Sequence, residues 1–199
     1  MKQKLAIGTV QFGLNYGIAN KHGQVSFSEG KEIISFAREN GIDTLDTAIG
    51  YGESEKVLGQ IGVNSWNVIT KLPSMPIDCG SILAWTKSSF VESLQKLRLD
   101  KVYGLLLHRP QELLSERGNE IYQGLSELKA EGLVKKIGIS IYDVSELELL
   151  TKHFDFDLIQ APMNVIDRRL LFSGWLEKLK QKNIEVHIRS AFLQGLLLM

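Results

Sequence analysis

Segments typical of buried strands alternate with amphipathic helical segments along the whole chain, and no linker interrupts the alternation. We expect seven strands, at residues 5–9, 44–46, 67–70, 102–107, 136–140, 158–160 and 185–189. Helices are expected between them, at about 26–40, 53–61, 80–97, 118–131, 144–153 and 168–182. Such alternation forms a parallel sheet covered by helices. This pattern constrains the fold more than any other feature of the sequence.

Two architectures fit this pattern, an open doubly wound sheet and a barrel. In a doubly wound sheet the ligand-binding groups gather at a switch point after one or two strands. Here polar candidates follow nearly every strand: Thr9, Asp46, Lys71, His108, Ser140, Gln160 and Arg189. No Gly-x-Gly-x-x-Gly sequence follows the first strand. The distribution predicts an α/β fold of the (β/α)8-type TIM barrel, incomplete, with about seven βα units present.

Composition favours an ordinary globular protein and argues against several classes of partner. The 199 residues suit one domain, 1–199, in which 44% of residues are hydrophobic and 23 basic residues balance 23 acidic ones. No basic stripe predicts nucleic-acid binding, and no apolar run is long enough to cross a bilayer. The four histidines are scattered, so no metal site is expected. The single Cys79 excludes an internal disulfide and favours a reducing cytoplasm.

The segment 44–55 carries the densest concentration of candidate catalytic groups. It begins as a strand, turns sharply at two glycines and continues into a helix. This places Asp46 at the carboxyl end of the strand and Tyr51 on the loop that follows. Lys71 and His108 end the next two strands. Because catalytic groups of barrels collect at the carboxyl ends of strands, we expect these four side chains to converge.

Each of these four residues alone has an ordinary structural explanation. Asp46 could cap the turn, and Tyr51 could be a surface aromatic. Lys71 could be a solvated surface lysine, and His108 a hydrogen-bonded histidine at a strand end. Their order on successive strand ends favours the catalytic interpretation.

The sequence resembles the aldo-keto reductase family over nearly its whole length. The most specific element is Leu45-Asp-Thr-Ala-x-x-Tyr-Gly52, followed by Lys71 and His108 at the next two strand ends. Further matches are Gly8-Thr9 with Gly13, Ser54-Glu55, Gly132-Leu-Val-x-x-Ile-Gly-Ile-Ser140, Gln160 with Asn164, and Gln194-Gly195. The resemblance implies an eight-stranded barrel that reduces a small carbonyl substrate with NADPH, less often with NADH.

The resemblance also implies catalytic roles for four residues. Tyr51 would donate the proton to the carbonyl oxygen. A nearby ammonium favours phenolate, so Lys71 should lower the pKa of Tyr51, and Asp46 should keep Lys71 charged and oriented. His108 would hydrogen-bond the carbonyl oxygen and fix its direction.

Cofactor contacts are implied for residues near the ends of four strands: Gly8, Thr9, Ser140, Gln160, Arg189, Ser190, Gln194 and Gly195. Ser140 and Gln160 match positions that bind the nicotinamide carboxamide, and the loop 190–195 matches one that touches the pyrophosphate. Arg189 stands where many members place an aromatic side chain that stacks on the nicotinamide. A guanidinium also stacks, but it adds a positive charge. This charge predicts either easier release of oxidised cofactor or a negatively charged substrate.

The strand pattern ends with the seventh strand, whereas a complete barrel typically takes about 250 residues. We expect the chain to be truncated at the C-terminus, without the eighth strand and the segment that binds the adenine and 2′-phosphate. A gap between strands seven and one would expose two unpaired strand edges, which favour pairing with other chains. We therefore expect another chain, such as a second copy in a homo-oligomer, a swapped element or the local segment itself to cover the gap.

Three functions follow from the sequence. The first is an NAD(P)H-dependent oxidoreductase with Tyr51 as proton donor. The second is a catalytically weak or silent aldo-keto-reductase-like fragment that acts as an oligomeric or partner-binding unit. An isomerase or lyase that uses Lys71 to form an imine is disfavoured, because Asp46 should keep Lys71 protonated and poorly nucleophilic.

Overall fold

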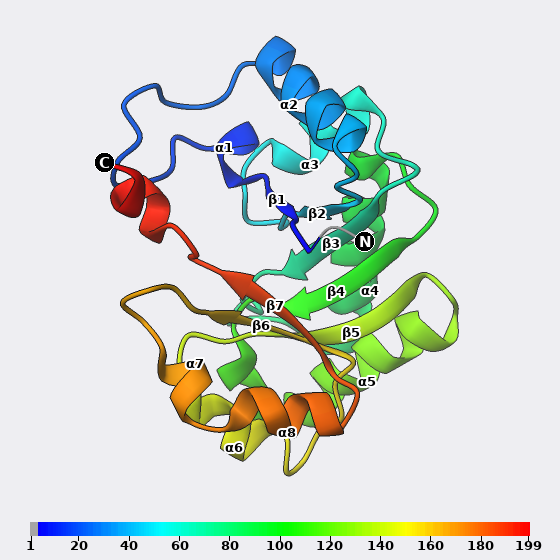
Figure 1. Cartoon of the computed structure of the whole chain (residues 1–199). Coiled ribbons are helices and arrows are strands. Elements are labelled where there is room, and N and C mark those ends of the chain that lie inside the picture. The colour runs from blue at the N-terminus through cyan, green and yellow to red at the C-terminus, as the bar shows by residue number, and fades with distance from the viewer. Residues whose placement is uncertain (1–3) are drawn as a thin grey trace.

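The computed structural model describes residues 4–199, so residues 1–3 of the expected domain lie outside the described part. Seven parallel strands form one sheet, and their order in the sheet is their order in the chain. They are β1 (Ile7–Gly8), β2 (Thr44–Asp46), β3 (Asn67–Leu72), β4 (Val102–Leu107), β5 (Val134–Ser140), β6 (Leu158–Pro162) and β7 (Glu185–Arg189). The sheet curls into an incomplete barrel (Figure 1), which confirms the predicted architecture.

Helices cover the outer face of the curled sheet (Figure 1). The longer ones are α2 (Phe27–Glu39), α3 (Ser54–Ile61), α4 (Ile82–Leu97), α5 (Gly118–Ala130), α6 (Ser145–Leu150) and α8 (Trp175–Gln181). Shorter turns are α1 (Val10–Gly13), η1 (Pro110–Leu114), α7 (Arg169–Phe172) and η2 (Leu193–Leu198). Ser26 caps α2 by accepting a hydrogen bond from the backbone N–H of Glu29. None of the helices within residues 4–199 is long and apolar enough to span a membrane.

Two predictions of local structure are wrong. The single helix expected at 168–182 is two helices, α7 and α8, because Gly174 between them adopts a φ of +74°. This left-handed conformation interrupts a right-handed helix and is accessible to glycine at little cost. The loop expected after the first strand contains the short helix α1, and β1 itself is only two residues long.

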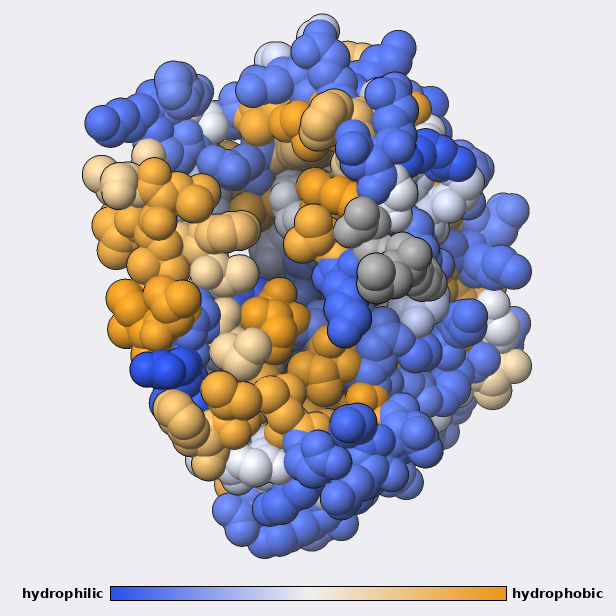
Figure 2. Space-filling view, in the orientation of Figure 1, coloured by the Kyte–Doolittle hydropathy of each residue, from blue (hydrophilic) through white to orange (hydrophobic). Residues whose placement is uncertain are grey.

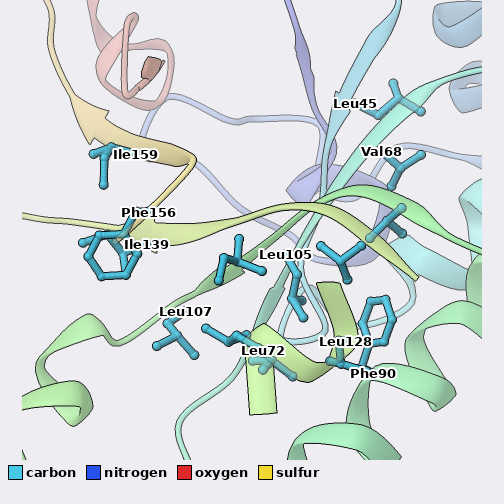
Figure 3. Close-up of a cluster of buried hydrophobic side chains, with 14 of the residues drawn as sticks. Leu45, Val68, Leu72, Phe90, Leu105, Leu107, Leu128, Ile139, Phe156 and Ile159 are labelled. Carbon is cyan, nitrogen blue, oxygen red and sulfur yellow. The ribbon is translucent and has the colours of Figure 1, made fainter. Parts of the chain in front are cut away.

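Hydrophobic side chains fill two spaces, one on each face of the sheet. The larger core lies between the sheet and the helices and includes Leu45, Phe90 and Leu105 (Figure 3). The smaller cluster joins Ile69, Leu106 and Leu158, with Tyr103 packed against it. Since side chains alternate along a strand, Ile69 shares the inner face of β3 with Lys71, two residues further on. Burial on both faces explains the nearly continuous apolar runs of the strands.

β1 and β7 are the two edges of the sheet, and no ladder joins them within residues 4–199. A groove of about 500 Å³ lies beside β7 and is lined by apolar side chains such as Leu176 and Val186 and by charged ones such as Lys180. A second groove, of about 480 Å³, lies beside β1 and is lined by Ile7, Ile33 and Phe36 among others. The barrel is therefore open along one side.

The segment η2 reaches across one end of this opening. The carbonyl oxygen of Gln194 accepts a hydrogen bond from Ala19 N at 3.4 Å, and its side chain accepts one from Ile18 N at 3.2 Å. Phe192, directly before η2, and Leu198, at its end, remain 59% and 70% exposed. Figure 2 shows hydrophobic side chains gathered on this face of the molecule.

Candidate active site

The ammonium of Lys71 is fully buried at the carboxyl end of β3. Its Nζ lies 2.7 Å from both carboxylate oxygens of Asp46 and 2.9 Å from the carbonyl oxygen of Thr47. The hydroxyl oxygen of Tyr51 is 3.4 Å from the same nitrogen. A buried charge is tolerated when it is paired and hydrogen-bonded, and these contacts use the donors of an ammonium. The predicted association of Asp46, Lys71 and Tyr51 is thus present in the structure.

Two glycines in contact position the loop that carries Tyr51. A Cβ added at Gly13 would lie 1.8 Å from the carbonyl oxygen of Tyr51, and one at Gly52 would lie 2.6 Å from the carbonyl oxygen of Gly13. Gly52 also has a φ of +56°. This close approach places the ring of Tyr51 at 5.7 Å from the ring of His108, edge to face. All four predicted catalytic side chains therefore come together.

Three buried hydroxyl groups connect this loop to β1 and β2. The hydroxyl of Ser54 lies 2.8 Å from the carbonyl oxygen of Thr9 and 3.0 Å from the hydroxyl of Thr47. The hydroxyl of Thr9 donates to the backbone carbonyl of Asp46 at 2.9 Å. The side chain of Thr9 has no exposed surface. In this structure it therefore belongs to the hydroxyl cluster and cannot contact a cofactor.

Ser140 and Gln160 extend the same network from β5 and β6. The amide of Gln160 donates to Asp46 Oδ1 at 2.7 Å, and its oxygen accepts a hydrogen bond from the Ser140 hydroxyl at 2.9 Å. Both residues are at least 96% buried. These two side chains, predicted to hold the nicotinamide carboxamide, orient the carboxylate of Asp46 in this structure. Gly8, in contrast, is exposed at the end of β1.

Burial dominates the protonation equilibria of the site. Burial and then the charge of Asp46 raise the pKa of Tyr51 above its ordinary value. Burial also lowers the pKa of Lys71, although the contacts with Asp46 oppose this change. Burial and then Lys71 lower the pKa of His108 to about 4, so its imidazole is neutral near pH 7. The prediction that Lys71 lowers the pKa of Tyr51 is wrong for this structure, because Asp46 compensates the ammonium and the phenol is buried.

Arg189 lies at the end of β7, near the same rim. Its guanidinium donates to the carbonyl oxygen of Ile141 at 2.9 Å and to the hydroxyl of Ser190 at 3.2 Å. The guanidinium carbon lies 4.2 Å from the centre of the Tyr142 ring. Tyr142 is not among the residues predicted from the sequence; its only sequence signal is its position two residues after β5. Ser190 further accepts a hydrogen bond from Asn164 through its carbonyl oxygen at 3.1 Å.

The fold and this cluster together define a parallel βα-barrel protein whose ionisable side chains gather at the carboxyl ends of its strands. That is the side on which such barrels carry their active sites. The chain belongs to the aldo/keto reductase family, whose family model matches residues 4–199. Within residues 4–199 no group of three or more His, Cys, Asp or Glu side chains is arranged to hold a metal ion.

Several curated relatives are named as oxidoreductases. The oxidoreductase sirO of Leptosphaeria maculans is 31% identical over 150 residues, which are 73% of this chain and 45% of that protein. The methylglyoxal reductase DkgA of Escherichia coli is 30% identical over 159 residues, 74% of this chain and 51% of the relative. An NADH-specific methylglyoxal reductase of Escherichia coli is 26% identical over 189 residues, 81% and 56% of the two chains. The chain thus spans about half the length of the curated relatives it matches.

Solved structures of aldo-keto reductases have the same fold. The holo form of an enzyme from Bacillus halodurans superposes with a TM-score of 0.78 at 21% identity, covering 97% of this chain and 63% of the other. An aldo-keto reductase of Bombyx mori in complex with NADP gives a TM-score of 0.67 at 22% identity, with coverage of 94% and 62%. At these identities the likeness establishes the fold alone.

Proposed function

We propose that this chain is an NAD(P)H-dependent oxidoreductase that reduces a small aldehyde or ketone. The observation that carries the proposal is the contact of the Tyr51 hydroxyl with the Lys71 ammonium, which is itself paired with Asp46. Reduction of a carbonyl requires a hydride at carbon and a proton at oxygen. The cofactor supplies the hydride when bound, and the residues of the chain supply the proton.

Tyr51 holds its proton until the carbonyl oxygen gains negative charge. Its raised pKa keeps the phenol protonated across the physiological range. When the phenol gives its proton to the carbonyl oxygen, the Lys71 ammonium at 3.4 Å stabilises the phenolate that remains. His108 is neutral near pH 7, so it can donate a hydrogen bond to the carbonyl oxygen without competing as an acid.

The residues around this cluster fit a nicotinamide cofactor in part. Ser190, Gln194 and Gly195 have positive φ values of 58°, 56° and 89°. Turns of this kind can present backbone N–H groups to phosphates. Here the N–H groups of Leu193 and Gly195 donate to the carbonyl oxygens of Ser190 and Phe192, and a pyrophosphate would have to replace these bonds. Gln160 is hydrogen-bonded to Asp46 and Ser140 to Gln160, so binding of the carboxamide would require both side chains to change partners.

NADPH is the proposed cofactor, with NADH as the alternative. The bound NADP of the Bombyx mori structure supports the first, and the name of the NADH-specific Escherichia coli relative supports the second. Methylglyoxal is the first substrate to test, because two of the relatives described above are named methylglyoxal reductases. Titration of each reduced cofactor, followed by its fluorescence, determines which one the chain binds.

The variant Tyr51→Phe removes one hydroxyl and tests the proton donor. We expect turnover of methylglyoxal to fall about 100-fold or more, the range of general acid catalysis, while the affinity for the reduced cofactor is retained. Tyr122→Phe is the matched control, because its hydroxyl binds the carbonyl oxygen of Asp155 outside the site. Unchanged turnover in Tyr51→Phe would exclude the proposed proton donor.

A second candidate function is self-association without catalysis. It is favoured by the unpaired edges of β1 and β7 and by the apolar groove around Phe36, which is 68% exposed. Sedimentation over a range of concentrations should then show dimers that Phe36→Glu weakens. Ile77→Glu is the control, since Ile77 is 97% exposed and lies on a loop away from both edges. A monomer at every concentration would contradict this candidate.

A further inference from the structure

Arg189 is a cation at the rim of the site with no carboxylate partner among residues 4–199. Its guanidinium donates to the Ile141 carbonyl and to the Ser190 hydroxyl. Its Nε is buried and has no acceptor in the described part of the chain, residues 4–199. Buried N–H groups in folded proteins nearly always have a partner, so this nitrogen is an unsatisfied donor beside the site. It has almost no accessible surface, so an acceptor from outside the chain reaches it only when the Arg189 side chain shifts.

The orientation of the guanidinium suits an oxyanion. The stack on Tyr142 at 4.2 Å uses the flat face of the group and leaves its edge for hydrogen bonds. The edge of a guanidinium matches a carboxylate or a phosphate, to which it donates charge-assisted hydrogen bonds. A bound oxyanion would accept from the terminal guanidinium nitrogens, each of which keeps one N–H beside its bond to Ser190 or Ile141, and would compensate the charge.

The charge of Arg189 acts on the groups proposed to handle the carbonyl. Its positive charge acts to lower the pKa of Tyr51, of Lys71 and of His108. It favours the phenolate of Tyr51 and disfavours the protonated forms of Lys71 and His108. The ammonium of Lys71 is compensated by Asp46, whereas the charge of Arg189 is not. The rim therefore carries an excess positive charge close to the proposed position of the substrate.

We infer that Arg189 binds the carboxylate of a 2-oxo acid substrate whose carbonyl faces Tyr51 and His108. The inference rests on the proposed function and names its substrate class. In a 2-oxo acid the carboxylate is bonded directly to the carbonyl carbon, so one anchor fixes both groups. The carbonyl carbon gains a hydride from a reduced nicotinamide, and the oxygen gains the Tyr51 proton. The products are a 2-hydroxy acid and oxidised cofactor, and Tyr51 regains its proton from water.

Pyruvate and methylglyoxal form a matched substrate pair, because both have three carbons and a ketone. Pyruvate has a carboxylate at the position where methylglyoxal has an aldehyde. In Arg189→Gln we expect kcat/KM for pyruvate to fall about 10- to 100-fold, the usual effect of losing a charged hydrogen bond. Arg189 also acts on the pKa of Tyr51 and of His108, so the readout is the ratio of kcat/KM for pyruvate to kcat/KM for methylglyoxal, which should fall about 10-fold or more. Arg168→Gln is the control, because its guanidinium also stacks on an aromatic ring, that of Phe172 at 5.4 Å, away from the site.

Oxamate, a pyruvate analogue that the enzyme does not reduce, provides a readout that is independent of turnover. It should raise the melting temperature of the parent chain and of Arg168→Gln, but not that of Arg189→Gln. Arg189→Lys, which keeps the charge, should retain part of the shift and serves if the Gln variant does not fold. If neither carbonyl is reduced but oxamate binds through Arg189, the proposed reaction fails and the anion site stands.

A phosphate group of the cofactor would accept the same hydrogen bonds from Arg189 as a substrate carboxylate. The two oxyanions give different experimental results. If Arg189→Gln weakens NADPH binding and lowers kcat/KM equally for pyruvate and methylglyoxal, the oxyanion belongs to the cofactor and the substrate inference is overturned. Equal oxamate binding by the parent chain and Arg189→Gln would also overturn it.

Discussion

Replacing Lys71 by methionine tests the buried ion pair at the centre of the site. Methionine has a similar length but no ammonium, so Asp46 loses both contacts of 2.7 Å and the Thr47 carbonyl loses its contact of 2.9 Å. Removing one partner of a buried pair costs about 3–5 kcal/mol. Asp46 keeps the amide of Gln160, and 18% of its side chain is exposed, so we expect a cost near the lower end, about 3 kcal/mol.

Urea unfolding followed by tryptophan fluorescence measures this cost. With a slope of about 3 kcal/mol per M for a chain of this size, the midpoint should fall by about 1 M. Asp46→Asn should lower stability by a similar amount, because the ammonium of Lys71 is then buried without a counter-charge. The double variant contains neither charge and should lose clearly less than the sum of the two single losses. Additive losses would refute the inference that the two charges stabilise each other.

Two further predictions concern His108 and Gly13. Because the pKa of His108 is about 4 in the folded chain and near 6.5 when unperturbed, the unfolded chain takes up this proton first as the pH falls, and stability should drop between about pH 6.5 and pH 4. In His108→Gln this drop in stability should be smaller by about 2 kcal/mol, a figure already reduced because the ring is partly exposed. If the pH–stability curve of the variant equals that of the parent chain, the lowered pKa of His108 is contradicted. Gly13→Ala should lower the free energy of unfolding by about 2 kcal/mol and slow carbonyl turnover, since its Cβ would collide with the Tyr51 carbonyl. Gly80→Ala, where a Cβ meets nothing within 4 Å, should change neither unfolding nor turnover.

The sequence was sufficient to predict that four polar side chains converge. Asp46 ends β2, Lys71 is the last residue but one of β3, and His108 directly follows β4. Tyr51 lies on the loop after β2. In a parallel sheet the carboxyl ends of neighbouring strands meet at one edge, so strand assignment alone brings these residues together. No knowledge of side-chain packing was required for this step.

Quantities that depend on burial could not be predicted in this way. The pKa of Tyr51 follows from how much of the phenol is buried and from Asp46, and neither appears in the spacing of the motif. The same holds for Gly174, where the helical pattern continues through the residue although the backbone does not. Gln160 was predicted to bind a cofactor, but its amide binds Asp46 across the sheet interior, a contact between residues 114 positions apart in the chain.

The open side of the barrel lies next to the proposed oxyanion site at Arg189 and farther from the proposed proton donor, Tyr51, with Lys71 and Asp46. β2 and β3, which carry Asp46 and Lys71, have paired neighbours on both sides, and the pairs Asp46–Ile69 and Lys71–Leu106 fix their register. Arg189 ends β7, which is paired on one side only. Edge strands with few backbone partners open more readily than central ones. A partner that covers β1 and β7 should therefore change the affinity for cofactor or oxyanion, and leave the Tyr51–Lys71–Asp46 geometry unchanged.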